Sequence, residues 1–172
     1  PINGVKQGNY NPEIQLIAPQ RLELMVYNTA YRSEKNSTVN FELAASNKDK
    51  NLFSSIDDTD NTGFASKFNY SFEKETNKKF MLNSEINIDY IDKNFQPIER
   101  IYNTEFNRDW SIDNILDRNK NQLLSDVSIG LKSYRFGNFD YQIENLELGN
   151  NYKGTRNNLV ITLEKIDGLK IF

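Results

Sequence analysis

The stretch FMLNSEINIDY, residues 80–90, decides the fold because apolar and polar residues alternate along most of its length. On an extended chain one side then carries Phe80, Leu82, Ile86, Ile88 and Tyr90, and the other carries Asn83, Glu85, Asn87 and Asp89. Successive side chains of a β-strand point to opposite faces, so this period of two predicts a strand with one apolar face and one wet face. Helical spacing would scatter the carboxylates and amides around the surface and does not explain their separation.

The same alternation recurs on both sides of this stretch. It predicts further strands near residues 21–30, 39–46, 64–73, 99–110, 122–135, 139–148 and 158–166. Turn residues separate them, and Gly137-Asn138 is a hairpin signal. Residues 1–20, with several Gly and Pro, are expected to be an irregular lead-in, and 21–172 to form an antiparallel β domain. The prediction is an all-β antiparallel meander of about eight long strands.

Length and composition exclude several classes of protein. A chain of 172 residues suits one domain. The net charge of −3, with both signs interspersed, gives no basic stripe for nucleic acid. The chain has no His, the commonest general base, and no Cys for thiolate metal sites. No window approaches 18 consecutive apolar residues, as a transmembrane helix requires. We therefore do not expect an enzyme.

Strand length and loop rhythm bear on where the sheet resides. Several predicted strands have about ten residues or more, whereas strands of globular proteins average about 5–6. The first connections alternate between short and long, at 33–36, 47–61 and 74–79. Outer-membrane barrels have short periplasmic turns and longer external loops. An outer-membrane β-barrel, or part of a larger one, is the first interpretation, and a soluble β-sandwich is the alternative, since alternation is the same in both.

One string has the composition of a Ca²⁺ loop. Asp58, Asp60 and Thr62 place oxygen side chains on alternate residues, and Gly63 follows for a sharp turn. An EF-hand would carry a bidentate Glu at the twelfth position, where Asn69 stands. These residue types are also ordinary in solvated turns. The three residues are retained as a candidate Ca²⁺ site, and no other cofactor is expected.

Carboxylates for a hydrolase can be drawn from Glu85, Asp89, Glu105 and Asp109. Glycoside hydrolysis needs two such groups on facing sides of a site. Asparagines occupy the same predicted faces at the same spacing, so a hydrated wall explains the whole set. We assign no catalytic residue.

Aromatic residues cluster near the predicted strand ends. The candidates are Tyr102, Phe106, Trp110, Tyr134, Phe136 and Tyr141. In a barrel such rings would form a girdle at headgroup level. In a soluble module they would stack on a bound sugar, and in a closed core they would simply pack.

Two stretches resemble a known kind of protein: ELAASNKDKNLFSSIDDTDNTGFASKFNYSF (42–72) and IDKNFQPIERIYNTEFNRDWSI (91–112). They are similar to segments of large outer-membrane, surface-associated β-proteins of Bacteroidota, of the Asn- and Lys-rich flavobacterial kind. The resemblance extends over most of residues 20–166. It implies that these strands belong to a much longer barrel of which this chain is one part, and it supplies no catalytic residue.

The expected function is a structural or transport segment of a bacterial outer-membrane β-barrel. The expected partners are the lipid bilayer and other outer-membrane subunits, without nucleic acid. The alternative is a secreted or cell-surface β-sandwich module that binds glycan or protein, with Ca²⁺ at Asp58, Asp60 and Thr62.

Overall fold

The computed structural model describes residues 17–56, 58–76, 79–112, 120–133 and 135–163. The strands are β1 (Arg21–Arg32), β2 (Ser37–Asp49), β3 (Thr62–Thr76), β4 (Phe80–Ile91), β5 (Gln122–Ser133), β6 (Gly137–Leu148) and β7 (Tyr152–Leu163). Two short helices, η1 (Asp58–Asp60) and α1 (Phe106–Asp109), lie in connections. The predicted all-β class is confirmed.

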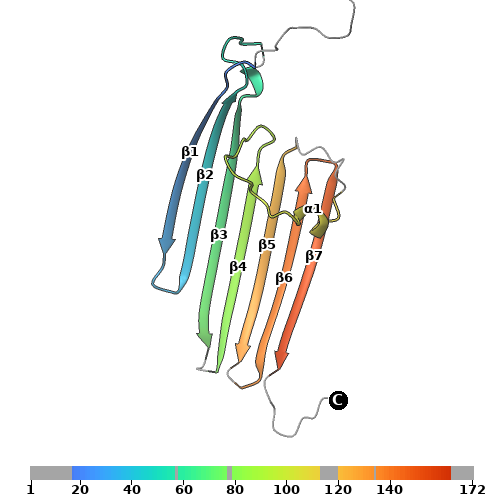
Figure 1. The fold of residues 1–172 in the computed structure, drawn as a ribbon. Coiled ribbons are helices and arrows are strands. Elements are labelled where there is room, and N and C mark those ends of the chain that lie inside the picture. The colour runs from blue at the N-terminus through green and yellow to red at the C-terminus, as the bar shows by residue number, and fades with distance from the viewer. Residues whose placement is uncertain (1–16, 57, 77–78, 113–119, 134, 164–172) are drawn as a thin grey trace, which may run out of the picture.

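All the strands form one antiparallel sheet in the order β1-β2-β3-β4-β5-β6-β7 (Figure 1). Each strand pairs with its neighbour along the chain, so the predicted meander is confirmed as well. The sheet is open: within the described strands, β1 and β7 each pair on one side alone. The strands have 12 to 15 residues, long enough for the 9–11 residues that a transmembrane β-strand needs.

The predicted strand at 99–110 is wrong, and the described sheet has seven strands instead of about eight. Residues 92–121 form one connection between β4 and β5 that contains α1. Tyr102, Phe106 and Trp110 recur every four residues, a spacing that fits a helix as well as a strand.

The connections sort by length between the two ends of the sheet (Figure 1). Short connections, residues 33–36, 77–79 and 134–136, join strands at one end, which we call the turn end. The opposite, loop end carries the long connections 50–61 and 92–121 and the short turn 149–151. Without a strand at 99–110, the alternation expected from the sequence extends through residue 121.

The two faces of the sheet differ in chemistry. The apolar face carries Val39, Tyr70, Ile86, Val127 and Ile143, which are register partners across β2 to β6. The polar face carries the sequence neighbours of these residues, Asn40, Asn69, Asn87, Asp126 and Glu144. They are also register partners. The strand register therefore places the apolar residues of β2 to β6 on one face and their polar residues on the other.

Strand β1 departs from this pattern because it is apolar on both faces. Met25, Tyr27 and Tyr31 lie on the apolar face, opposite Ala45, Leu43 and Val39. Leu22, Leu24 and Val26 form a shared row, as the alternation predicted, but they lie on the polar face beside Lys48, Ser46 and Ala44.

Among the described residues, the buried hydrophobic residues are Ala44, Ile91 and Leu146 on the polar face of the sheet and Trp110 in the connection 92–112. Leu146 has 0% exposure. By contrast, large side chains of the apolar face are widely exposed, such as Met25 at 72% and Ile161 at 57%. The small core of the protein therefore lies on the polar face of the sheet.

In the part of the chain that the structure describes, no helix is long and apolar enough to cross a membrane.

Candidate functional site on the polar face

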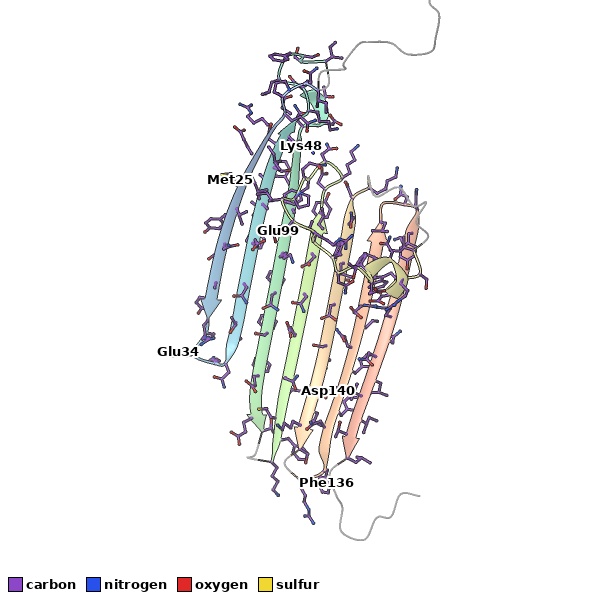
Figure 2. The ribbon with its side chains drawn as sticks, in the orientation of Figure 1. Met25, Glu34, Lys48, Glu99, Phe136 and Asp140 are labelled. Atoms are coloured by element: carbon purple, nitrogen blue, oxygen red, sulfur yellow. The ribbon has the colours of Figure 1, made fainter. Side chains whose placement is uncertain are left out.

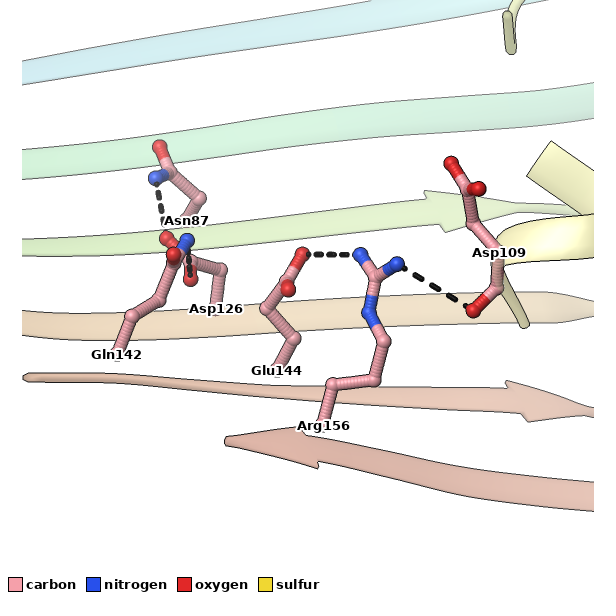
Figure 3. A network of polar contacts seen from close by, with 6 residues as sticks. All are labelled: Asn87, Asp109, Asp126, Gln142, Glu144 and Arg156. Atoms are coloured by element: carbon pink, nitrogen blue, oxygen red, sulfur yellow. Dashed lines mark hydrogen bonds and ion pairs between the residues drawn. The ribbon is translucent and has the colours of Figure 1, made fainter. Parts of the chain in front are cut away.

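A row of amide and carboxylate side chains crosses the polar face from strand to strand. Asn40 donates to Asn69 (2.9 Å), Asn69 to Asn87 (2.7 Å), and Asn87 to Asp126 (3.0 Å). Gln142 donates to the other oxygen of Asp126 at 2.7 Å (Figure 3). Asn40, Asn69, Asn87 and Asp126 are register partners on neighbouring strands, and Gln142 lies two residues from Glu144, the register partner of Asp126. Both direct and diagonal cross-strand neighbours are close enough to interact. The row joins β2 to β6 through side chains as well as backbone.

The connection 92–112, which we call the docked loop, lies on the loop-end half of this face. Its first part approaches the sheet closely at Gly63 and Ser46. The Gln96 backbone N–H donates to Ser46 Oγ at 2.9 Å. A Cβ atom on Gly63 would lie 2.1 Å from the Phe95 nitrogen, so a larger residue at 63 would push the loop off the sheet.

The second part of the docked loop is held by β7. The Arg156 guanidinium lies 4.2 Å from the centroid of the Trp110 ring, within range of a cation–π interaction. It also pairs with Glu144 at 2.9 Å and donates to the Asp109 carbonyl at 3.5 Å (Figure 3). The Tyr152 hydroxyl donates to the Trp110 carbonyl. Arg156 therefore ties α1 to two strands.

Aromatic rings give the docked loop its own small core. Tyr102 and Phe106 stack with centroids 3.9 Å apart, and Phe106 and Trp110 are 6.4 Å apart. Burial, with a smaller contribution from the charge of Asp89, raises the pKa of Tyr102 from 10.0 to about 12. Both causes disfavour the phenolate, because burial and a nearby negative charge each penalise a second negative charge.

A cavity of about 580 Å³ lies between the docked loop and the strand ends. From the sheet it is lined by Lys48, Ile91, Gln122 and Leu148, all on the polar face at the loop end. From the docked loop it is lined by residues that include Lys93, Arg100, Tyr102 and Phe106. Its size falls in the range of roughly 300–1,000 Å³ that is typical of small-molecule sites.

The structure separates the aromatic candidates into groups. Tyr102, Phe106 and Trp110 lie together over the polar face, and Tyr102 and Phe106 line the cavity. Tyr141 is on the apolar face in β6, where its hydroxyl donates to Asn157 at 2.8 Å. Phe136 is in a turn at the turn end, with the Arg135 guanidinium 5.4 Å from its ring (Figure 2). Tyr134 lies outside the described residues.

The candidate Ca²⁺ residues lie at η1 and the start of β3, where protein groups contact them. Asn61 donates to Asp58 at 3.1 Å, Lys50 lies 3.9 Å from Asp60, and Asn47 donates to the Thr62 hydroxyl at 3.2 Å. In the described ranges no group of three or more His, Cys, Asp and Glu is arranged to hold a metal. A Ca²⁺ site here stays a prediction.

The four carboxylates considered for hydrolysis do not share one strand pair. Glu85 and Asp89 are on the polar face of β4, where Glu85 accepts from Asn69 at 2.8 Å and Asp89 pairs with Lys67 at 3.4 Å. Glu105 and Asp109 belong to the docked loop, and both pair with Arg108. Because residues 99–110 are not a strand, Glu105 and Asp109 do not lie opposite Glu85 and Asp89 on paired strands.

Sequence reasoning missed the residues that hold the docked loop, chiefly Gly63 and Arg156. Arg156 contacts Asp109 across 47 positions of sequence, and no local pattern indicates a contact of that kind. The isolated Gly63 at the start of a strand was an available signal, since glycine in a strand often marks the close approach of another backbone.

Comparison of the chain with models of protein families, with curated proteins and with solved structures gives no match.

Proposed function

We propose that this chain forms part of the wall of a bacterial outer-membrane β-barrel, with a structural or transport role. In this arrangement the apolar face contacts lipid, the polar face lines an aqueous lumen, and the docked loop lies on the lumen side. The proposal assigns no catalytic reaction to the chain.

The exposed apolar face is the observation that carries the proposal. Charged side chains on this face occur, within the described strands, only close to strand ends: Arg21, Glu23, Asp49, Lys74, Glu147 and Lys153. Between them lies an uncharged band in which most large side chains are exposed. An exposed apolar patch that extends across all the strands of a sheet marks an interaction surface. A membrane barrel presents such an apolar band to lipid.

The polar face and the connections support the same assignment. Asparagine, carboxylate and basic side chains on one face suit a water-filled interior. One end carries short connections alone, and both long loops lie at the other end beside the short turn 149–151, which fits periplasmic and external ends. The free edges of β1 and β7 are then continued by further strands of the barrel, since an exposed edge is a template for pairing. Those strands and the bilayer are the proposed partners.

The alternative, a secreted or surface β-sandwich, needs a second sheet packed against the apolar face. Every strand in the described ranges belongs to one sheet. A sandwich would therefore have to obtain its second layer from another chain or another part of the protein.

Two arginine substitutions at adjacent positions of β5 test the proposal. Val127 is on the apolar face near mid-strand, and Ser128 is on the polar face at the same depth. Val127→Arg should weaken folding into vesicles by about 2–4 kcal/mol, the cost of Arg at the bilayer midplane of a barrel. Ser128→Arg, the matched control, should change it by about 0.5 kcal/mol or less. Equal effects of the two substitutions on folding into vesicles would count against a lipid-facing apolar face.

A further inference from the structure

The cavity under the docked loop has an excess of positive charge. The cationic residues in its lining are Lys48, Lys50, Lys93, Arg100 and Lys120. The acidic residues there are Asp60 and Asp92. Asp60 lies 3.9 Å from Lys50, and the Asp92 carboxylate accepts the Asn94 backbone N–H at 2.8 Å. Both acids already contact groups of the protein. Since the five basic residues outnumber the two acidic ones, the net charge of the lining is positive.

Four cations of the lining form no ion pair with any residue that the structure describes: Lys48, Lys93, Arg100 and Lys120. The chain as a whole is nevertheless acidic, at −3. Lys48 belongs to β2 at the loop end of the polar face, far from the turn end that Phe136 marks (Figure 2). Like charges gathered around a concave site raise the local potential and attract ions of opposite sign. The charge of the cavity selects an anion.

The remaining lining indicates what the anion is attached to. Side-chain amides of Gln96, Asn103, Asn107 and Gln122 offer both donors and acceptors. The Tyr102 and Phe106 rings supply apolar surface in the same cavity. A few polar groups on an apolar and aromatic wall are typical of sites that fix the orientation of a small organic molecule. A sugar ring matches this lining because its hydroxyls can pair with amides and its C–H face can pack on an aromatic ring.

From this geometry we infer that the cavity binds a water-soluble acidic sugar, a saccharide unit that carries a carboxylate or a phosphate. The cavity opens on the polar face, on the opposite side of the sheet from the exposed apolar side chains, so a lipid headgroup does not reach it under the proposed function. Basic groups hold the anion, amides hold the hydroxyls, and Tyr102 with Phe106 contacts the ring. The inference deepens the proposed function. It rests on that function in one respect, namely that the polar face meets water and the apolar face meets lipid.

Titration calorimetry on the whole chain in detergent micelles tests this inference, with Trp110, the single Trp, as a fluorescent reporter beside the site. The probes are glucose 6-phosphate, glucuronic acid, neutral glucose and inorganic phosphate. Both acidic sugars should bind, and glucose and inorganic phosphate should each bind about tenfold or more weakly, since each lacks one set of contacts. Equal binding of phosphate and glucose 6-phosphate would mean that the ring contributes nothing, and failure of both acidic sugars to bind would overturn the inference.

A pair of double variants separates the site from general charge. Lys93→Gln with Arg100→Gln should weaken binding of both acidic sugars by about tenfold or more. Lys79→Gln with Arg135→Gln removes the same charge from the turn end and should leave binding unchanged. Equal losses in the two double variants would show non-specific attraction and contradict the inference. If the chain inserts in vesicles but binds no acidic sugar, the ligand inference alone fails; if it binds them without inserting, the barrel proposal alone fails.

Discussion

Single side chains decide whether the docked loop stays on the sheet. Arg156 stands between Glu144, the Asp109 carbonyl and the Trp110 ring, so one guanidinium connects β6, β7 and α1. Its planar shape presents donors at the edge and a face to an aromatic ring, which Lys does not reproduce. Gly63 has the opposite role, because it is the absence of a side chain that lets the Phe95 backbone approach.

Replacing Arg156 should release the loop. Arg156→Gln removes the cation–π contact and leaves Glu144 without its partner, so docking should weaken by about 1–3 kcal/mol. Iodide quenching of Trp110, which is 4% exposed in the docked state, measures the change. Lys153→Gln on the same strand is the control, because its pair with Glu147 is exposed and worth little. Equal quenching of Trp110 in the two variants would refute the anchoring role.

Tyr102 makes loop docking sensitive to alkaline pH. Its pKa is about 12 when docked and 10.0 ordinarily, so between pH 10 and 12 the docked loop keeps a proton that the undocked loop loses. Docking is therefore fully favoured by this group below pH 10 and weakens as pH rises toward 12. Trp110 quenching should increase over that window more in the wild type than in Tyr102→Phe, which lacks the phenol group. The same pH profile in both proteins would contradict this account.

At the scale of elements, the alternating stretches predicted all seven strands, although the last was expected at 158–166 and lies at Tyr152–Leu163. The alternation did not predict that β1 is apolar on both faces. The stretch at 80–90 became β4 within a residue at its end, because a period of two admits only an extended chain. A strand was wrongly predicted at 99–110 because aromatic residues spaced by four fit the period of a helix as well as that of a strand. The helix there is held by contacts to Arg156 and Tyr152, which are distant in sequence. The cavity was not predictable, since it forms only when that loop folds back on the strand ends.

The polar row is an element-scale device that should stabilise the sheet. Asn87 sits at its centre and bonds with Asn69, Glu85 and Asp126. Asn87→Ala should lower the free energy of unfolding by about 1–2 kcal/mol, because two partners lose a cross-strand contact. Asn83→Ala, on the same face and strand but outside the row, should cost less. Denaturant unfolding in micelles compares the two, and an equal loss would show that the row adds nothing beyond strand propensity.

Over the whole molecule, the sheet is amphipathic with its small core on the wrong side for a soluble protein. The docked loop covers part of the polar face, while the large aromatic and aliphatic side chains of the opposite face are exposed. A protein in water would bury the second set first, since apolar burial is the dominant favourable contribution to folding. Under the proposed function a lipid environment removes this contradiction, because the apolar face then needs no cover from protein.

The central claim is that the apolar face meets lipid, and adjacent cysteines test it most directly. The chain has no native Cys, so Ile129→Cys and Ser128→Cys each carry a single environment-sensitive dye, on the apolar and the polar face of β5. In reconstituted vesicles, the dye at 129 should be quenched by a quencher on the lipid acyl chains and protected from iodide. The dye at 128 should show the reverse. Iodide quenching at 129 equal to that at 128, with no quenching from the acyl chains, would contradict the account.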